Sequence, residues 1–494
     1  MTMAVQLTKN VADFLSKPVQ HFIGGKFQHS ALGTTGHVVN PSDGSTLAAI
    51  ALGTAPEIDE AVAAAWRAFP TWSALSPNER AAKIHRFAEH LEKHSADLAL
   101  LESLDVGKAI SAAEAFDVPF GIECLRYYAN LSTLAQYEVP LAVKNIEARV
   151  HRGPFGVCGF IFPWNFPFTL LMWGVAPALA AGNTVVIKPS EVTPLSSMFV
   201  AKLAAEAGIP DGVINMVLGD GPGAGAALAA HPKIKRMSFT GSPEVGRKIG
   251  EVCGRNLVPC KLELGGKGAA VVFADADVDA TAQKLAGAIT LNTGQVCCTA
   301  TRWFVHEKIY DRFVDKAVAA LKEVKMGPGP ARETQMGPLV SAAQRQRVLR
   351  YVENGVKEGA KALLPGGSAA PRGCEGGFYV QPSLLAGSPD NVCCREEIFG
   401  PSAFVVKFND QTDAISLVNQ LAYGLANSVW TSDLKRAAQV AERMIAGNSW
   451  INAHNVFAYG LPYGGVNLSG FGGGVNSPET FYDYLRPQTI ARPL

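Results

Sequence analysis

The chain has 494 residues, more than one hydrophobic core usually organises, so we expect two large domains. Its composition, 48% hydrophobic and 18% charged, is typical of a compact enzyme and not of a disordered chain. The formal net charge is +1 with both signs interspersed, which excludes a basic surface that holds nucleic acid or an anionic membrane by electrostatics alone. We therefore expect a small-molecule partner.

The nine cysteines and ten histidines do not have the spacing of a disulfide framework or a metal centre. The adjacent pairs at 297–298 and 393–394 cannot form ordinary disulfides without strain, and the spacing of His85, His90 and His94 favours a solvated helix face. We expect no metal and a reducing, cytoplasmic location. The first 18 residues lack the apolar core of a secretory signal, so we expect the mature chain to begin near its first residue.

Two segments have the pattern of edge strands. Residues 131–151 and the C-terminal YDYLRPQTIARPL contain stretches that alternate with a period of two, and each includes a proline. Within sheets, proline is confined mainly to edge strands, and edge strands invite pairing with another chain. We therefore expect both segments to contact another subunit.

Residues 153–187 contain no Asp, Glu, Lys, Arg or His, and this stretch is long enough to span a bilayer. Prolines and Asn165 divide it into short pieces. Because covered parallel strands also read as unbroken apolar runs, we interpret the stretch as a buried strand, a polar turn and a buried helix.

From Val157 onward, short β-rich runs alternate with helical patterns. The strand-like runs are VCGFIF, TVVI, VINMV and KRMSF, and the helical ones begin near Phe168 and continue with SSMFVAKLAAEAG, AALAAH and PEVGRKIGEVCG. This alternation predicts βαβ units on a parallel sheet. A second series starts with AAVVF at 269–273, followed by helices near 277–293 and 309–324, which predicts another α/β domain.

Two short segments carry a candidate nucleophile and a candidate base. Cys297 lies in TGQVCCT, between a helical pattern and a strand-like run, where a thiol with a lowered pKa is a strong nucleophile; taken alone, Cys297 and Cys298 also fit two buried, inert cysteines. Glu263 ends a strand-like run and precedes two glycines, which allow close backbone approach to a ligand. A solvated surface turn explains Glu263 equally well, and ELGGK is not a phosphate-binding P-loop because Gly268 stands where Ser or Thr is needed.

Other candidates follow the strands of the first series. Asn165 ends the apolar run in FPWN, where an amide donor could stabilise an oxyanion. In IKPSE, Lys188 and Glu191 could hold ribose hydroxyls, or form a cap or turn. FTGS at 239–242 lies at a strand-to-helix turn suited to a pyrophosphate, whereas GDGPG at 219–223 is a weaker dinucleotide signal because it is followed by Ala224.

Together these segments resemble the aldehyde dehydrogenase superfamily, in order and over nearly the whole chain. The motifs that carry the resemblance are FPWN, KPSE, FTGS, ELGGK, GQVC, EEIFGP ending at Pro401, and PYGG at 462–465. The resemblance implies an α/β fold of two Rossmann-like parallel-sheet domains plus a small β oligomerisation domain. On this basis residues 1–130 and 152–261 form the cofactor-binding domain, 262–468 the catalytic domain, and 131–151 with 480–494 the oligomerisation segments of a homodimer or homotetramer.

The resemblance also implies a mechanism. Cys297 attacks the aldehyde, the Asn165 amide and the Cys297 N–H hold the oxyanion, NAD takes the hydride, and Glu263 activates the water that hydrolyses the thioester. NADP is a second acceptor to compare, since only Glu191 disfavours its 2′-phosphate. The residues expected to bind the cofactor are Phe162, Trp164, Lys188, Ser190, Glu191, Gly241, Ser242, Leu264, Glu397 and Phe399.

The expected substrate pocket consists of Phe166, Leu170, Trp173, Cys298, His454, Phe457 and Tyr463, which favours a hydrophobic, aromatic or semialdehyde substrate. Leu170 and His454 stand where betaine aldehyde enzymes usually have cation-binding aromatic rings, so that substrate is disfavoured. The chain also departs from the family's late Lys and Gly-Arg-Glu, with Asn467 and FGGGVN in their place.

Three alternatives stay open. A CoA-acylating semialdehyde dehydrogenase would use CoA to resolve the thioester, but Glu263 argues against it because acylating members generally lack that base. A catalytically silent, structural member of the fold is disfavoured by the joint presence of Cys297, Glu263 and Asn165. A Cys–His hydrolase would need His306 as its base, and a strand-like run is a poor setting for one.

Overall fold

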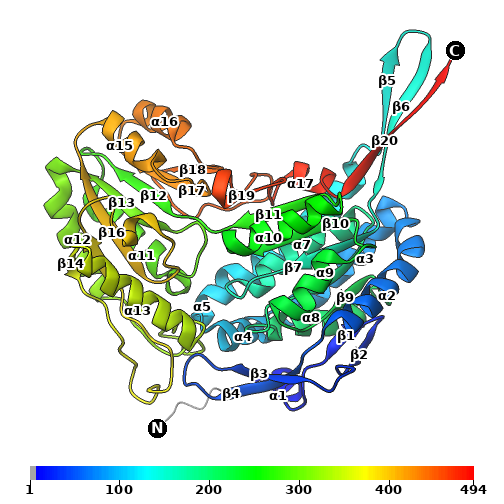
Figure 1. Ribbon diagram of the computed structural model, residues 1–494, viewed down its shortest axis with the longest axis horizontal. Coiled ribbons are helices and arrows are strands. Elements are labelled where there is room, and N and C mark those ends of the chain that lie inside the picture. The colour runs from blue at the N-terminus through cyan, green and yellow to red at the C-terminus, as the bar shows by residue number, and fades with distance from the viewer. Residues whose placement is uncertain (1–6) are drawn as a thin grey trace.

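The computed structural model describes residues 7–494 and contains two α/β bodies, from one of which a β arm projects (Figure 1). The first body is built on an eight-stranded sheet whose five central strands are parallel. In spatial order its strands are β19 (Gly470–Phe471), β11 (Cys260–Leu264), β10 (Arg236–Gly241), β7 (Val157–Ile161), β8 (Thr184–Lys188), β9 (Ile214–Met216), β1 (His21–Ile23) and β2 (Lys26–Gln28).

Helices cover both faces of this sheet. One face packs on α2 (Ala55–Ser73), α9 (Ala226–Ala230) and α10 (Pro243–Arg255), and the other on α7 (Pro167–Ala180) and α8 (Leu195–Glu206), backed by α3 (Pro77–Lys93), α4 (Ser95–Val106) and α6 (Val118–Leu134). Val157 and Ile161 of β7 enter one core, and Cys158 and Phe160 enter the other. The strand is apolar throughout because it is buried on both faces.

The predicted reading of residues 153–187 is therefore confirmed: β7 is followed by a turn, by the buried α7 and by β8. Among residues 7–494, no helix combines the length and the apolar character that crossing a membrane requires. The remaining helices and strands predicted from Val157 to residue 324 are also present in the order expected.

The second body contains a seven-stranded sheet that is parallel except for β14. Its strands, in spatial order, are β14 (Lys361–Leu364), β15 (Ser383–Ala386), β16 (Ser402–Phe408), β13 (Ala300–His306), β12 (Gly268–Val272), β17 (Ala426–Trp430) and β18 (Asn448–Ile451). One face packs on α11 (Val278–Thr290) and α12 (Tyr310–Lys322), and the other on α13 (Ala342–Lys357), α15 (Gln411–Asn419) and α16 (Leu434–Arg443). The two predicted parallel-sheet bodies are thus both observed.

The chain crosses from the first sheet to the second at residues 265–267, directly after β11. The expected boundary between residues 261 and 262 falls inside this strand, and all of β11, including Glu263, is bonded to β10 in the first sheet. The first body therefore supplies Glu263, while the second body supplies Cys297.

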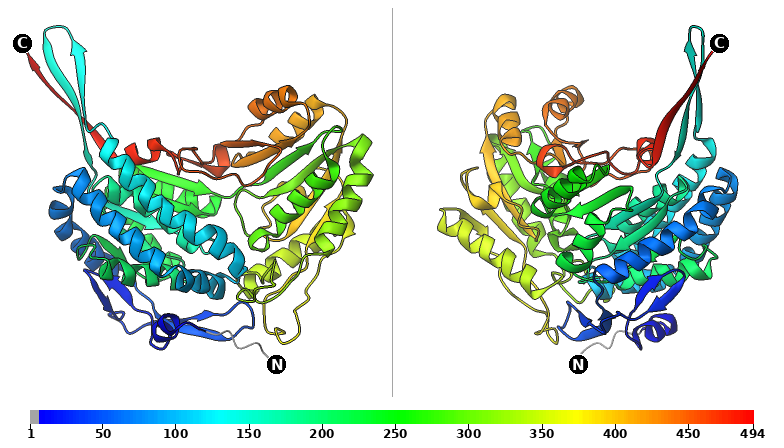
Figure 2. Two further views of the ribbon diagram at one scale, coloured as in Figure 1. Left: turned by 180° about the vertical axis from the view of Figure 1, so that it is seen from behind. Right: turned by 45° about the vertical axis from the view of Figure 1, so that its right-hand side comes forward.

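The β arm is a separate three-stranded antiparallel sheet in the order β20 (Leu485–Pro493), β6 (Ile146–Pro154), β5 (Glu138–Val143). Figure 2 shows it standing clear of both bodies. The edge-strand expectation is right for β5 and β20, which carry Pro140 and Pro487, but wrong for β6, which lies in the centre. Residues 131–134 also differ from the expectation, since they complete α6.

Several smaller elements complete the structure. They are α1 (Lys9–Leu15), a hairpin-like pair of β3 (Thr35–Val39) and β4 (Thr46–Ala51), α5 (Ile110–Ala112), α14 (Val392–Arg395) and α17 (Pro478–Tyr482). The expectation that the mature chain begins near residue 1 concerns residues 1–6, which lie outside the described range.

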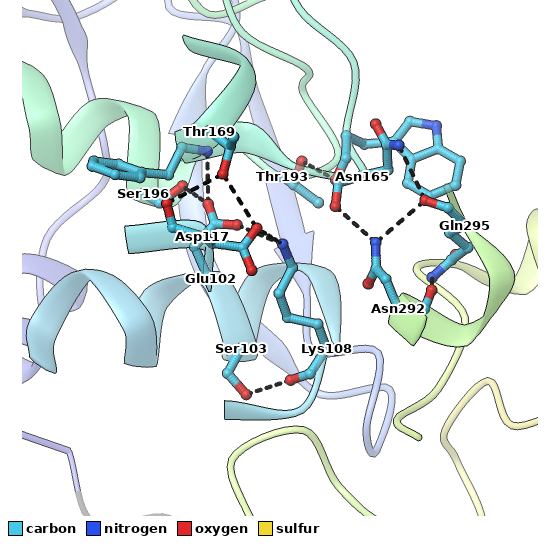
Figure 3. A network of polar contacts seen from close by, with 12 residues as sticks. Glu102, Ser103, Lys108, Asp117, Asn165, Thr169, Thr193, Ser196, Asn292 and Gln295 are labelled. Carbon is cyan, nitrogen blue, oxygen red and sulfur yellow. Dashed lines mark hydrogen bonds and ion pairs between the residues drawn. The ribbon is translucent and has the colours of Figure 1, made fainter. Parts of the chain in front are cut away.

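A buried ion network anchors the start of α7 (Figure 3). Lys108 is 1% exposed, and its Nζ donates to Glu102 Oε2 at 2.9 Å and to Asp117 Oδ1 at 2.8 Å. The other oxygen of Glu102 accepts the backbone N–H of Phe168 at 2.9 Å, in the first turn of α7. Burial acts to lower the pKa of Lys108, but the two carboxylates together raise it above its usual value. The network therefore ties α4 and the segment around Asp117 to the helix that follows Asn165.

Replacing Lys108 with Met should destabilise the protein strongly, because two buried carboxylates lose their cation. We expect a loss of about 3–5 kcal/mol, visible as a lower thermal unfolding midpoint. The control is Lys248→Met, which removes an exposed partner of Glu244 and should change the stability by only about 0.5 kcal/mol. An equal, small effect of both substitutions would contradict the anchoring role of Lys108.

Candidate active site

A pocket of about 240 Å³ lies where the strand ends of the two sheets meet, and both bodies supply its walls. It contains ten of the residues expected from the sequence. The residues that line it are Pro163, Trp164, Asn165, Leu170, Thr240, Gly241, Ser242, Glu263, Leu264, Gly265, Cys297, Gln344, Arg347, Glu397 and Phe399.

The turn before Cys297 adopts an unusual backbone. After α11, Asn292, Thr293 and Gly294 have φ values of 46°, 57° and 71°, in the left-handed region. This region is costly for a β-branched residue such as Thr293, whose hydroxyl donates to the Gly337 carbonyl at 2.9 Å. At Gly294, a side-chain Cβ would lie 2.2 Å from the Gly400 carbonyl carbon, so only glycine fits. The tertiary structure therefore imposes this turn on the chain.

Hydrogen bonds join this turn to the loop that carries Asn165 (Figure 3). Asn292 Nδ2 donates to the Asn165 carbonyl at 2.9 Å, and Asn165 Nδ2 donates to the Gln295 carbonyl at 3.0 Å. The Gln295 side chain donates to the Asn292 carbonyl and accepts the N–H of Val340 at 2.9 Å. An amide nitrogen has two hydrogens, so one hydrogen of Asn165 Nδ2 is left for a ligand in the pocket that it shares with Cys297.

The thiol of Cys297 is half-buried and has polar neighbours. Its Sγ lies 3.4 Å from the Tyr463 hydroxyl, and the neighbouring Cys298 Sγ lies 3.4 Å from Asn455 Oδ1. Hydrogen bonding from Cys298, aided by Tyr463, lowers the pKa of the Cys297 thiol in spite of its burial. Cys297 is thus set apart chemically from Cys298, whose pKa is raised.

Glu263 is the penultimate residue of β11, its carboxylate is buried in the pocket, and within residues 7–494 neither of its oxygens has a hydrogen-bond partner. Burial raises the pKa of Glu263 to about 8, and the nearby Lys261 acts in the opposite direction. A buried carboxylate without partners is costly, whereas a base whose pKa lies near neutral pH is efficient in proton transfer. The solvated-turn interpretation of Glu263 is therefore wrong.

The glycines after Glu263 allow a close approach, but it is made by another side chain. Glu397 Oε1 accepts the N–H of Gly266 at 2.9 Å, and a Cβ on Gly265 would lie 2.3 Å from Glu397 Oε2. Burial raises the pKa of Glu397 to about 7. Glu397 and Glu263 thus enter the same pocket from opposite bodies.

Sequence reasoning missed Gln344 and Arg347, which line the pocket from α13. Gln344 Nε2 donates to the Phe399 carbonyl at 2.7 Å, and Arg347 donates to the Glu397 carbonyl at 2.6 Å. Phe399 has a φ of 62° and meets the Trp164 ring edge-on at 5.2 Å. Both missed residues lie on an amphipathic helix outside any motif. The periodic pattern of apolar and polar residues in α13 is the only sequence signal that could have suggested them.

Thr240, Gly241 and Ser242 line the pocket at the start of α10, where Ser242 Oγ caps the helix by accepting the N–H of Val245 at 3.3 Å. Lys188 and Glu191 lie at the end of β8, outside the lining of this pocket, and pair with each other at 2.6 Å. Ser190 Oγ accepts the N–H of Val192 in a turn. IKPSE therefore forms a turn, and this turn is also compatible with ribose binding by Lys188 and Glu191.

On the far side of Cys297 the walls are aromatic. The rings of Trp173, Phe457 and Tyr463 lie 5.3–6.0 Å apart, and Tyr463 lines both an inner cavity with Cys297 and a second cavity of about 240 Å³ with Phe457. Further rings that the motifs did not indicate extend this wall: Phe116, Phe120, Trp450 and Tyr459.

Some residues expected in the substrate pocket do other work. His454 Nε2 bonds the Cys298 carbonyl at 2.9 Å and Nδ1 bonds Ser428 Oγ at 3.0 Å, while burial lowers its pKa to about 4. A neutral His454 therefore steadies the cysteine loop. Phe166 packs on Lys108, whose Nζ lies 4.3 Å from the ring centroid. Phe162, expected to bind the cofactor, lines the inner cavity with Trp173.

Comparison with known proteins identifies the family. A profile described as the aldehyde dehydrogenase family matches residues 27–490. The chain belongs to the aldehyde dehydrogenase family.

Its relatives match over almost their whole length. A phenylacetaldehyde dehydrogenase of Pseudomonas fluorescens is 39% identical over 93% of both chains. An aldehyde dehydrogenase of Bacillus cereus, solved as an NAD⁺ complex, is 37% identical with a TM-score of 0.95 over 99% of both chains. PnpE of Pseudomonas sp. WBC-3, solved with nicotinamide adenine dinucleotide, is 40% identical with a TM-score of 0.94 over 96% of this chain and 97% of that one. These comparisons confirm the resemblance found in the motifs.

The geometry of this aldehyde dehydrogenase does not support a Cys–His pair. His306 ends the seven-residue β13, which begins beside the cysteine loop, so the strand places it roughly 20 Å away. His306 Nδ1 accepts the N–H of Lys308 instead. The nearer His454 contacts a carbonyl and not the thiol of Cys297.

The histidines on α3 are less solvated than expected. The His90 and His94 side chains are 25% and 21% exposed, and ring nitrogens of both lie within 4.8 Å of each other and of a Glu206 oxygen. The expectation that the histidines lack the spacing of a metal centre is therefore wrong for His90 and His94. Lys202 already supplies a cation to Glu206 at 2.9 Å, and His94 Nδ1 is bonded to Asp97. The cluster is accounted for as a set of surface ion pairs.

Substituting Tyr463 with Phe should raise the pH at which Cys297 becomes reactive, because the thiolate loses a hydroxyl donor. A hydrogen bond to a charged group contributes about 1.5–3 kcal/mol, so the midpoint of alkylation by iodoacetamide against pH should move up by about 1–2 units. The control is Tyr459→Phe in the same aromatic wall, since the Tyr459 hydroxyl donates to the Phe120 carbonyl. Equal midpoints for the wild type and Tyr463→Phe would refute a contact between this hydroxyl and the thiolate.

Proposed function

We propose that this protein oxidises an aldehyde to the carboxylate with NAD as the hydride acceptor and Cys297 as the covalent nucleophile. The observation that carries the proposal is one pocket that holds the lowered-pKa thiol of Cys297, the unpaired carboxylate of Glu263 and the amide of Asn165. A nucleophile, a base and an oxyanion donor are the three groups that acyl chemistry requires.

In the first half of the reaction, the Cys297 thiolate attacks the aldehyde carbon. The developing oxyanion would be held by the free hydrogen of Asn165 Nδ2 and by the Cys297 backbone N–H. The bonds of Asn165 to the turn at Asn292 and Gln295 fix this donor before the substrate arrives, which is the arrangement that lowers a barrier most.

In the second half, Glu263 removes a proton from water as the water oxygen bonds the acyl carbon of the thioester, and the carbon–sulfur bond breaks to return the thiolate. The apolar pocket suits this role, because burial has already raised the proton affinity of the carboxylate.

The residues present fit a dinucleotide cofactor. Ser242 and Gly241 open the 13-residue α10 at the pocket wall, where the helix N-terminus would bind the pyrophosphate with Trp164. Glu397 and Phe399 would hold the ribose next to the reacting ring, and Lys188 with Glu191 the other ribose. The remaining contacts are proposed for Phe162, Ser190 and Leu264. When bound, NAD accepts the hydride released from the carbon attached to the sulfur.

The preference for NAD over NADP rests on Glu191, whose carboxylate would repel a 2′-phosphate. Because Lys188 already pairs with this carboxylate at 2.6 Å, the repulsion is partly offset, and NADP remains a second acceptor. Initial rates with the two cofactors measure the preference directly.

The alternatives differ in what resolves the thioester. A CoA-acylating enzyme would have no use for a buried base aimed at the thioester, so Glu263 disfavours it. A silent structural member of the fold would be under no requirement to place Cys297, Glu263 and Asn165 in one pocket. Formation of an acyl-CoA, or no reduction of NAD with any aldehyde, would revive one or the other.

We also propose that the β arm mediates a homodimer or homotetramer, and that the enzyme works in the cytoplasm. The exposed apolar side chains on the arm, Leu141, Val143, Ile146 and Ile490, are each 37–46% exposed. All nine cysteines are free thiols, which fits a reducing compartment. Sedimentation velocity of the full chain and cell fractionation test these two points.

Two substitutions test the mechanism. Cys297→Ala should abolish aldehyde-dependent NADH formation while the protein still binds NAD, as measured by calorimetry. Glu263→Gln should leave a first burst of NADH but slow the steady state by about 10²–10⁴-fold, because acylation needs no base whereas hydrolysis does. Near-wild-type turnover of Cys297→Ala would overturn the assignment, and an unchanged steady state of Glu263→Gln would exclude its role as base.

The aromatic wall predicts the substrate class, and the relative that is a phenylacetaldehyde dehydrogenase supports it. Burial of a ring should give phenylacetaldehyde a kcat/KM about 10–100-fold above that of acetaldehyde, as followed by NADH absorbance. Phe457→Ala should reduce this ratio while leaving the rate with acetaldehyde almost unchanged. A panel in which short or semialdehyde substrates react best would move the proposal to those classes.

A further inference from the structure

Behind Cys297 lies an inner cavity of about 30 Å³, which is enough space for one or two water molecules. Glu263, Cys297 and Lys261 line it together. Strand residues two positions apart point to the same face, so β11 aims Lys261 and Glu263 into the same space. Neither the motifs nor the proposed mechanism gives this lysine a role.

Lys261 is unusually placed for a lysine. It is 1% exposed, and its Nζ donates to the Gly474 carbonyl at 3.2 Å. Lys261 and Glu263, both in the described part of the chain, form no direct ion pair, and both oxygens of Glu263 lack partners. A buried ammonium and a buried carboxylate that share a water-sized cavity interact strongly, because the surrounding dielectric constant is low.

Glycines make this arrangement possible. A Cβ on Gly464 would lie 3.2 Å from Glu263 Oε1 and 2.9 Å from the Gly474 Cα, and a Cβ on Gly472 would lie 3.1 Å from the Lys261 Cα. The loops that contain these glycines therefore pack directly over the two charged side chains. On their outer side they line an open groove of about 450 Å³.

Several titratable groups face Lys261. Glu263 lies towards the pocket, the one-third-exposed Asp483 lies outward, and Arg236, 3.8 Å from Asp483, adds a second positive charge. The thiol of Cys124 is fully buried with a raised pKa, and the ring of Tyr484 lies 5.5 Å from Lys261 Nζ. Among residues 7–494, Glu263 is the only carboxylate that lines the inner cavity with Lys261.

We propose that Lys261 is a positioning residue whose ammonium favours the ionised form of Glu263 and thereby sets the pH range of thioester hydrolysis. The proposal deepens the proposed function and depends on it. The hydrolysis step itself is unchanged: water loses a proton to Glu263, its oxygen bonds the acyl carbon, and the Cys297 thiolate leaves. Only an ionised Glu263 can accept that proton, and the ammonium of Lys261 stabilises this form.

The pKa shifts of Lys261 and Glu263 agree with their placement in one cavity. Burial lowers the pKa of Lys261 while Glu263 raises it, and burial raises the pKa of Glu263 while Lys261 lowers it. Removing the ammonium leaves Glu263 with burial alone, so its pKa must rise further. The rising limb of the hydrolysis rate against pH should then move to higher pH.

Para-nitrophenyl acetate isolates the hydrolysis step, since this activated ester can acylate the Cys297 thiolate without any hydride transfer. A burst of nitrophenolate reports acylation, and the slow phase that follows reports hydrolysis. Lys261→Gln is the decisive variant, because the amide can still donate to the Gly474 carbonyl but carries no charge. Lys261→Arg keeps the charge, and Lys284→Gln is the matched control for an exposed lysine that also donates to a backbone carbonyl.

For Lys261→Gln we expect a normal burst, a slow phase reduced about tenfold at neutral pH, and a rising limb displaced upward by about one pH unit. Lys261→Arg should return the limb towards the wild-type position, and Lys284→Gln should match the wild type. A limb in Lys261→Gln that coincides with the wild type would overturn the role of Lys261.

The same assay distinguishes a failure of the proposed function from a failure of the role of Lys261. A wild-type enzyme without a burst would overturn Cys297 as the nucleophile and this role of Lys261 with it, whereas a normal burst with an unshifted slow phase would overturn Lys261 alone. If circular dichroism shows that Lys261→Gln is unfolded, Lys261→Met must show the same displacement of the limb. A Lys261→Met limb at the wild-type position would be equally decisive against the proposal.

Discussion

The hydrogen bonds between Asn165 and the turn of Asn292 and Gln295 are the constraint on which the site depends, because they join the two bodies at the reacting atoms. The first body supplies the amide and Glu263, and the second supplies the thiol. Without these bonds the distance from donor to nucleophile would vary with any motion between the bodies, and misplacement by about 1 Å is enough to cost 10²-fold in rate. The strained turn at Thr293 persists because these partners determine it.

The same site contains several buried charged groups, and the unfavourable free energy of burying them must be offset by the rest of the fold. Among the described residues Glu263 is buried without a hydrogen-bond partner, Glu397 is half-buried with one, and Lys261 and Lys108 are buried cations. Lys108 is satisfied by two carboxylates and serves to anchor α7. Glu263 is left unsatisfied, and this is what makes it a base. Burial thus contributes to structure at Lys108, which has two carboxylate partners, and to chemistry at Glu263, which has none.

Much of the fold could be predicted from the sequence, because β7 and α7 are buried on all sides and their apolar runs reflect this. Cys297, Glu263 and Asn165 could be predicted to share a site because the short motifs that contain them together resemble those of one family. Gln344 and Arg347 could not, since they reach the pocket from an amphipathic helix whose sequence serves its packing. The central position of β6 was missed because period and proline content do not reveal which strand lies between two others.

The glycines at 464–474 make contacts that could not be predicted from the sequence. In the sequence, FGGGVN is recognisable only as a departure from the family's late pattern. In the fold, Gly472 packs on β11 and the Gly474 carbonyl accepts a hydrogen bond from the ammonium of Lys261, while Gly464 covers Glu263. Any side chain at Gly472 would collide with the Cys260 carbonyl, 2.2 Å from its Cβ position. The glycines and the buried lysine therefore depend on each other, because a loop without side chains leaves space for a cation beside the base.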